Sequence, residues 1–283
     1  MGEFVQLSDT RLFVETRGTG PAVIVLHGGP GADHTQLLDP LLPLTDEFTL
    51  HFVDQRSQGR SDPAPSDTWT IARAARDVTE LARALEAKQY AVLGHSYGAL
   101  VCLQHAVEWR GDAAAYVVSH GVPSRRWYRL SEELDRFDPV GLREQIRRAW
   151  TELEEATDSQ RMTELIALQA PFHFKDPFDP VIQVSNERMR EQMIHTPAVN
   201  QHFSTRGLET FDVEDALGSI EQPTLLLTGR GERVCPVDAA ELMAGRIPGA
   251  RLVVFENSGH VSYLEEPSLY VSVVRDFLRV HLG

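Results

Sequence analysis

The sequence predicts an α/β protein with a mostly parallel, doubly wound sheet and a block of helices inserted in the second half of the chain. Short, continuously apolar runs alternate with helical patterns, as in sheets covered on both faces. A Gly-x-Ser-x-Gly pattern at 94–98 joins one such run to a helix. Residues 124–212 are instead rich in Arg and Glu and show no strong strand pattern. We therefore predict a core domain, 1–123 and 213–283, and a helical cap, 124–212, over the strand ends where open α/β sheets bind ligands.

The first 123 residues predict a hairpin followed by alternating strands and helices. Two alternating runs flank a polar turn at 8–11, and the apolar side chains of 70–87 recur at helical spacing. The expected elements are, in order, the strands Phe4–Leu7, Leu12–Thr16, Ala22–Leu26 and Phe48–Val53, the helix Thr70–Ala87, the strand Ala91–Leu93, a helix from Ser96 to about Glu108, and the strand Ala115–Ser119.

The rest of the chain predicts the cap helices and then a return to strand–helix alternation. Asp138-Pro139 and Asp179-Pro180 each pair a helix-capping residue with a proline at the first helical position. The expected elements are the helices Ser131–Arg136, Val140–Thr157, Ser159–Gln169 and Val181–Ile194, the strand Thr224–Leu227, the helix Pro236–Arg246, the strand Arg251–Phe255 and the helix Ser268–His281.

Composition limits the possible partners and the compartment. The chain has 283 residues, 42% of them hydrophobic, which is enough for a substantial core. A net charge of −14 argues against nucleic acid or an anionic membrane as partner. The chain has only two cysteines, which suggests no disulfide framework and favours a reducing compartment. Its N-terminus does not resemble a secretory leader, and no apolar run approaches the roughly 20 residues of a membrane span. We expect a cytoplasmic monomer or small homo-oligomer that acts on a small molecule or short peptide.

Ser96 is the candidate nucleophile. Glycines two positions away on either side allow a tight turn that exposes Ser96 at the N-terminus of the next helix. A serine hydroxyl needs a base at neutral pH, and His260 is the best candidate because it follows a strand in a glycine-flanked loop. We expect His95 to point away from the site and His27 to brace its own loop.

An acid must orient His260 and stabilise its positive charge. The loop after the strand Thr224–Leu227 holds Glu232, whose carboxylate can reach the imidazole if the loop lies slightly further back than an aspartate would need. Asp238 is close in sequence but is expected on the following helix, and the loop after Ala115–Ser119 contains no carboxylate. We therefore predict a Ser-His-Glu triad.

The oxyanion formed during acyl transfer needs two fixed backbone N–H donors, each contributing roughly 3 kcal/mol. Tyr97, directly after the nucleophile, should provide one and Gly29 the other. Gly29 lies in the His-Gly-Gly-Pro-Gly run at 27–31, where small residues let the backbone approach a substrate. The glycine patterns of nucleotide-binding loops are not present, so a phosphate-binding interpretation fails.

These motifs resemble the proline iminopeptidase branch of the α/β-hydrolases, whose members order the triad Ser, acid, His. The matching segments are 27–31, Asp-Gln-Arg-Ser-Gln-Gly-Arg-Ser at 54–61, the motif at 94–98 and Ser-Gly-His at 258–260. The resemblance covers 1–123 and 213–283 well and the cap loosely. It implies an α/β-hydrolase fold, a cis Gly29–Pro30 peptide, and a metal-free serine peptidase that removes a small N-terminal residue, often proline. It also implies that cap glutamates recognise the free amine.

Several positions depart from that family pattern. Ser57 stands where the family has Gly, Glu232 where it has Asp, and Arg233 where one branch has an amine-binding Glu. The nearest counterpart of the cap motif Gly-Pro-x-Glu-Phe, at 196–203, has no Glu. The residues that could bind substrate instead are Glu187, Glu191 and Glu209, each more simply a solvated helix charge, and the aromatic Trp127, Trp150, Phe172 and Phe174.

Three functional hypotheses follow. The leading one is a cofactor-independent serine hydrolase, in its narrower form an aminopeptidase or aminoacyl-amide hydrolase. The second is an esterase, lactonase or thioesterase on a small apolar acyl substrate, suggested by the missing amine-binding glutamates. The third is a non-catalytic hydrolase-like binding protein. Epoxide hydrolases and haloalkane dehalogenases are disfavoured because they carry Asp where Ser96 stands.

Overall fold

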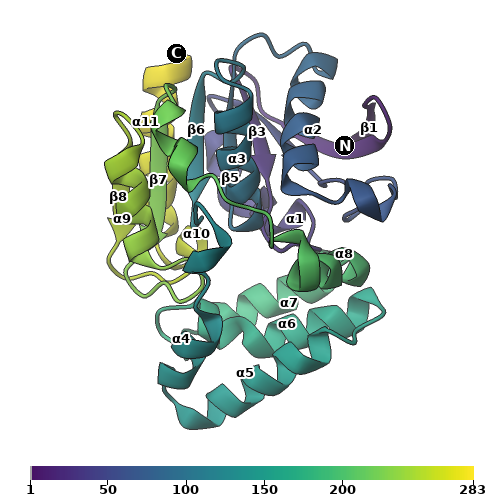
Figure 1. The fold of residues 1–283 in the computed structure, drawn as a ribbon, viewed down its shortest axis with the longest axis vertical. Helices are drawn as coiled ribbons and strands as arrows, with labels where there is room; N and C mark the ends of the chain where they lie inside the picture. The colour runs from purple at the N-terminus through teal and green to yellow at the C-terminus, as the bar shows by residue number, and fades with distance from the viewer. Residues whose placement is uncertain (1) are drawn as a thin grey trace.

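The computed structural model describes residues 2–283 and contains an eight-stranded sheet of order β1-β2-β4-β3-β5-β6-β7-β8 (Figure 1). The first two strands, β1 (Gly2–Gln6) and β2 (Arg11–Arg17), form an antiparallel hairpin that pairs antiparallel with β4. The remaining strands run parallel: β3 (Ala22–Leu26), β4 (Thr49–Val53), β5 (Tyr90–His95), β6 (Ala115–Ser119), β7 (Thr224–Gly229) and β8 (Arg251–Phe255). The predicted mostly parallel sheet is confirmed.

Each face of the sheet has its own hydrophobic core. Alternate residues of the central strand β5 point to opposite sides, so Val92 joins one cluster and Leu93 the other. The first cluster is covered by α2 (Ile71–Ala84), α3 (Tyr97–Glu108) and α9 (Val237–Arg246). The second is covered by α1 (Thr35–Leu41), α10 (Ser262–Glu265) and α11 (Pro267–Leu282). Burial on both faces explains why the strands read as continuous apolar runs.

Five helices lie between β6 and β7 in the sequence, and Figure 1 shows them together at one end of the molecule. They are α4 (Leu130–Arg136), α5 (Val140–Leu153), α6 (Ser159–His173), α7 (Val181–Gln192) and α8 (Pro197–His202), the last continued by a π-helical turn at Phe203–Gly207. Small apolar clusters around Phe172 and Met162 hold α4, α5 and α6 together.

The expected helices are present and differ from the observed ones mainly at their ends, whereas α1, α8 and α10 were not expected. Helix α5 stops at Leu153 rather than Thr157, while α6 continues past Pro171 to His173. Proline removes one helical hydrogen bond, but the extra turn buries Phe172 completely. Among residues 2–283, no helix combines the length and hydrophobicity that crossing a bilayer requires.

Candidate active site

Ser96 lies at the turn between β5 and α3, in a backbone conformation that L-residues rarely adopt. Its φ is 53° and its ψ is −114°. A Cβ at Gly94 would lie 2.1 Å from the Gly98 carbonyl oxygen, and one at Gly98 would lie 2.4 Å from that of Leu26. Glycine is therefore required at both positions, and the tight turn places the Ser96 side chain at the strand end.

The structure brings Ser96, His260 and Glu232 into one hydrogen-bonded line. Ser96 Oγ is 3.0 Å from His260 Nε2, and His260 Nδ1 is 2.7 Å from Glu232 Oε2. The second Glu232 oxygen accepts a 2.7 Å hydrogen bond from the Val234 N–H. The Glu232 side chain lies in the loop after β7 and is completely inaccessible to solvent.

The charge state of Glu232 fixes the direction of these hydrogen bonds. Burial alone would raise its pKa, but the hydrogen bonds from His260 and the Val234 N–H, together with the attraction of a protonated His260 or His120, hold the pKa of Glu232 at about 2. The carboxylate is thus ionised at neutral pH and accepts the Nδ1 proton of His260. Nε2 is then free to accept the proton of the Ser96 hydroxyl.

The loop that carries His260 is held from three directions. The His260 N–H donates to the His173 carbonyl at 2.6 Å, and the Gly259 N–H donates to Glu265 Oε2 at 2.7 Å. His120, at the end of β6, places Nε2 3.1 Å from the Gly259 carbonyl oxygen. No motif marks His120, His173 or Glu265, and the sequence analysis missed them.

Three further histidines surround the His260 ring, and the expectation for one of them is wrong. His95 does not point away from the site: its ring lies 5.0 Å from that of His260, and it lines the adjoining cavity. Burial lowers the pKa of His120 and of His173 to about 4, and that of His95 well below its usual value. All three are therefore neutral at pH 7 and add no positive charge beside His260.

The loop at 28–31 is held by side chains on both sides of Gly29. Gln36 Oε1 accepts the Gly28 N–H at 2.6 Å, and Gln58 Oε1 accepts the Gly31 N–H at 2.6 Å. Gly29 itself has a φ of 113°, and the Gly29–Pro30 peptide is cis, as the resemblance implied. Within the described chain the Gly29 N–H has no hydrogen-bond acceptor. Tyr97 starts α3, so its N–H has no intrahelical acceptor either.

The segment leading into α8 also binds this loop. The Thr196 N–H donates to the Gly31 carbonyl at 2.8 Å, and Asn200 Nδ2 donates to the Pro30 carbonyl at 3.0 Å. His27 braces the other side, as expected, because its Nδ1–H donates to the Gly28 carbonyl at 2.7 Å. Its Nε2 accepts from the backbone of the 54–61 segment.

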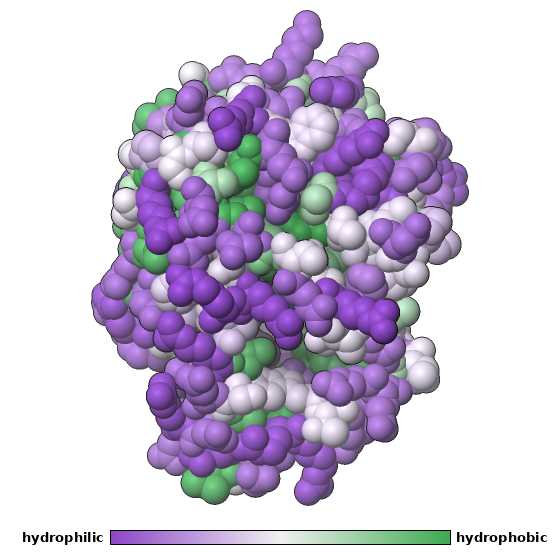
Figure 2. Space-filling view, in the orientation of Figure 1, coloured by the Kyte–Doolittle hydropathy of each residue, from purple (hydrophilic) through white to green (hydrophobic). Residues whose placement is uncertain are grey.

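A cavity of about 290 Å³ adjoins Ser96 and His260, between the strand ends and α6–α8. Figure 2 shows a largely hydrophilic surface, with apolar side chains visible in the recess between the cap helices and the rest of the molecule. The cavity wall is mostly apolar, with residues such as Met162, Ile166 and Met189 from α6 and α7. Among the described residues that line it, none is Asp or Glu.

The structure places four predicted substrate-binding residues away from this cavity. Glu187 and Glu191 are exposed on α7, and neither is among the residues that line the cavity. Trp127 is buried in the core and donates its Nε1–H to Glu214 at 3.1 Å, and Trp150 packs against Phe172. Helix packing therefore accounts for both tryptophans.

Of the remaining candidates, only Phe174 lines the cavity. Phe172 is fully buried among the cap helices, and Glu209 is exposed near Arg125. Arg233, for which the resemblance implied a glutamate in one branch of the family, donates to the Phe174 carbonyl at 2.6 Å and so holds the end of α6.

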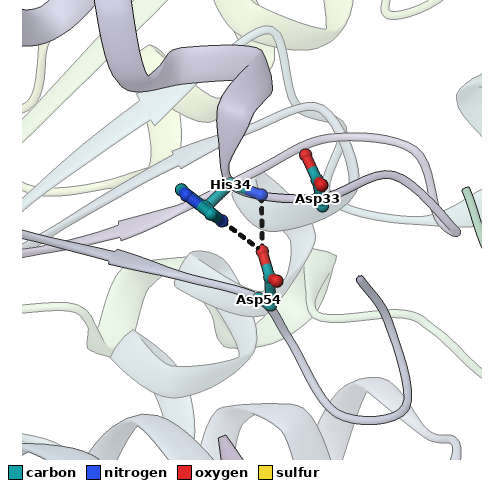
Figure 3. Close-up of side chains that lie close together, drawn as sticks. All are labelled: Asp33, His34 and Asp54. Atoms are coloured by element: carbon teal, nitrogen blue, oxygen red, sulfur yellow. Dashed lines mark hydrogen bonds and ion pairs between the residues drawn. The ribbon is translucent and has the colours of Figure 1, made fainter. Parts of the chain in front are cut away.

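A buried cluster of Asp33, His34 and Asp54 has the residue types of a metal site (Figure 3). Both carboxylates are already hydrogen-bonded. Asp54 accepts from the His34 N–H and from His34 Nδ1, at 2.8 and 2.6 Å. Asp33 accepts from Arg60 Nη1 at 2.7 Å and from the Ile194 N–H at 2.9 Å. The donors that surround these oxygens fit an ion-pair network joining three loops better than they fit a metal ion.

Comparisons with known proteins agree with this architecture. The sequence profile of a family described as alpha/beta hydrolase fold matches residues 21–267. A proline iminopeptidase of Saccharolobus solfataricus is 29% identical over 276 residues, covering 93% of this chain and 86% of the relative. A pimeloyl-[acyl-carrier protein] methyl ester esterase of Nitrosomonas europaea is 27% identical, covering 92% and 97%. The crystal structure of a proline iminopeptidase from Mycobacterium smegmatis superposes with a TM-score of 0.77 at 22% identity, covering 99% and 98%, which shows a shared fold.

Proposed function

Because the chain belongs to the alpha/beta hydrolase fold family, we propose that it is a serine hydrolase with Ser96 as nucleophile, His260 as general base and Glu232 as the orienting acid. One observation carries the proposal: the hydrogen-bonded line from Ser96 through His260 to a buried carboxylate. The same arrangement activates serine in unrelated hydrolases.

The geometry supports a two-step acyl transfer. His260 Nε2 takes the Ser96 proton while Oγ attacks the substrate carbonyl carbon. The N–H groups of Gly29 and Tyr97 stabilise the negative oxygen of the tetrahedral intermediate. His260 then gives the proton to the leaving group, and a water activated in the same way releases the acid.

The cavity favours a small ester whose acyl group carries no positive charge. An aminopeptidase substrate carries a free ammonium, and burying it without a partner is costly. No carboxylate is among the described cavity-lining residues, which do not include the predicted Glu187 and Glu191. A volume of about 290 Å³ is near the lower end of ligand pockets, so the substrate is small.

Hydrolysis of aminoacyl amides is the second candidate. It is supported by the loops at 27–31 and 54–61 and by relatives that are proline iminopeptidases. The ammonium would then have to be bound by backbone carbonyls or neutral side chains, such as Gln169 or Asn200 at the cavity wall.

Covalent labelling tests the catalytic assignment. A fluorophosphonate should label the wild-type protein at Ser96, and Ser96→Ala should neither label nor turn over substrate, a loss of about a million-fold. Its thermal unfolding midpoint should stay within a few degrees of the wild-type value. A folded wild-type protein that does not label would support the non-catalytic hypothesis. Comparing 4-nitrophenyl butyrate with proline 4-nitroanilide then separates the ester from the aminoacyl-amide candidate.

A further inference from the structure

The cavity next to Ser96 has a marked imbalance of charge. Arg188, on α7, is the one side chain with a permanent charge among the described residues that line it. Burial lowers the pKa of His95 and His173, and also that of His195, which falls to about 4. These lining histidines are therefore neutral at pH 7. The cavity thus holds a cation and no anion.

Arg188 retains hydrogen-bonding capacity. Its Nη2 lies 2.7 Å from a carboxylate oxygen of Asp39, and its Nε donates weakly to Gln192 at 3.4 Å. The guanidinium offers five N–H donors, and Nη2 makes no well-aligned hydrogen bond within the described chain. Asp39 is exposed on α1 and does not line the cavity.

A second donor in the same wall is also unpartnered. The side-chain amide nitrogen of Gln169, on α6, is buried and has no hydrogen-bond partner in the described chain. The Gln169 residue is 5% exposed. A buried donor without an acceptor costs about 1–3 kcal/mol, so a ligand that brings acceptor oxygens would relieve this cost.

Arg188 lines the same cavity as Ser96 and His260. Tyr263 and His95 also line it, and the Tyr263 ring lies 5.0 Å from that of His95, which in turn lies 5.0 Å from that of His260. Burial raises the pKa of Tyr263, and the charge of Arg188 partly offsets this effect. The cation and the catalytic groups therefore border one cavity.

We propose that Arg188 binds a carboxylate of the substrate, so that the preferred substrates are monoesters of short dicarboxylic acids. This inference rests on the proposed serine hydrolase function. The ester carbonyl lies at Ser96, and the free carboxylate at the other end of the acyl chain pairs with Arg188, helped by Gln169. A guanidinium and a carboxylate match in charge and in planar geometry.

Arg188 could instead serve only to tie α7 to α1 through Asp39, and two variants separate these roles. Arg188→Gln removes the cation, whereas Asp39→Asn removes the tie and leaves the cation in place. The test substrates are mono-ethyl glutarate and ethyl valerate, which have acyl chains of equal length and differ by the terminal carboxylate.

We expect the wild-type enzyme to prefer mono-ethyl glutarate. Arg188→Gln should raise KM for this ester about ten- to hundred-fold, as for loss of a charged hydrogen bond, with kcat little changed. KM for ethyl valerate should stay the same or fall. Asp39→Asn should keep the preference, and Arg188→Lys should restore part of it. Equal effects of Arg188→Gln on both esters, or the same loss of preference in Asp39→Asn, would overturn the proposal.

A measurement that does not need turnover complements these kinetics. Glutarate should slow fluorophosphonate labelling of the wild-type protein but not of Arg188→Gln, and valerate should protect both equally. If glutarate does not slow labelling of the wild-type protein, Arg188 does not bind the substrate carboxylate. The proposed serine hydrolase function would still stand. A wild-type protein that is never labelled would reject the proposed function itself.

Discussion

Glu232 is the proposed orienting acid, at a position where the resemblance implies an aspartate. Glu232→Gln keeps the size of the side chain but removes the charge that fixes the His260 tautomer. We expect kcat on an ester to fall about 10³–10⁴-fold, with the fluorophosphonate labelling rate falling in parallel. Glu256→Gln, in an exposed pair with Arg230, is the matched control and should leave both rates unchanged. Near-normal turnover by Glu232→Gln would place the acid elsewhere.

At the level of single residues, the candidate catalytic side chains could be picked out from the sequence because they lie in motifs or directly after strands. Ser96 and its glycines form a local pattern, and His260 and Glu232 follow strands at the expected places. Gln36, Gln58 and His120 could not be predicted, because their roles come from tertiary contacts between loops far apart in the chain. The substrate-binding residues were placed least well, because helical spacing alone does not say which face of α7 turns inward.

Among the elements, the three loops that meet at Arg60 depend on a buried ion pair. Arg60 Nη1 is 2.7 Å from Asp33 and 3.4 Å from Asp54, and both carboxylates are inaccessible to solvent. Arg60→Met would leave two buried carboxylates without their cation. We expect the free energy of unfolding to fall by about 3 kcal/mol in urea titrations.

The matched control is Arg230→Met, which breaks the exposed pair with Glu256. Exposed pairs contribute roughly 0–1 kcal/mol, so this variant should unfold almost like the wild type. An Arg60→Met variant no less stable than Arg230→Met would mean that the network contributes little to the fold.

Element prediction from sequence succeeded where a pattern was long or continuous. The strands Ala22–Leu26, Ala115–Ser119 and Arg251–Phe255 were predicted to the residue. The first two lie inside the sheet and are almost fully buried, so they read as nearly continuous apolar runs. Helix α1 was missed because it has seven residues and contains Pro40. Such short helices are stabilised by packing rather than by their own sequence.

At the scale of the whole molecule, buried histidines make stability depend on pH. The pKa of His120, His173 and His195 lies near 4 in the folded protein, below the usual 6.5, chiefly because of burial. Below pH 6.5 the unfolded chain binds protons that the folded protein cannot. The free energy of unfolding therefore falls as pH drops from about 6.5 to about 4, by about 1.4 kcal/mol per pH unit for each histidine.

Urea titrations at pH 7, 6 and 5 measure this slope. His195→Gln, which replaces a buried imidazole that contacts Thr163, should reduce the slope by the contribution of one histidine. His281→Gln, near the C-terminal end of α11, should leave it unchanged. Identical slopes in all three proteins would show that the buried His195 does not contribute to the pH dependence.

The overall architecture was predictable because its signals extend over long segments. Strands and helices alternate up to residue 123, and an Arg- and Glu-rich segment without strand patterns follows from residue 124. The shape and charge of the cavity could not be predicted from the sequence. They depend on single side chains that α6, α7, α8 and the strand-end loops bring together in the folded chain. The division into core and cap domains stays a prediction.

The contacts from Thr196 and Asn200 join α8 and the segment before it to the loop at 28–31. The same loop carries Gly29, whose N–H is proposed to hold the oxyanion. A change in α8 that removed both hydrogen bonds would therefore loosen this donor as well as the cavity wall that Asn200 forms. Substitutions in α8 can consequently alter the rate of acylation although α8 contributes no group to the proposed triad.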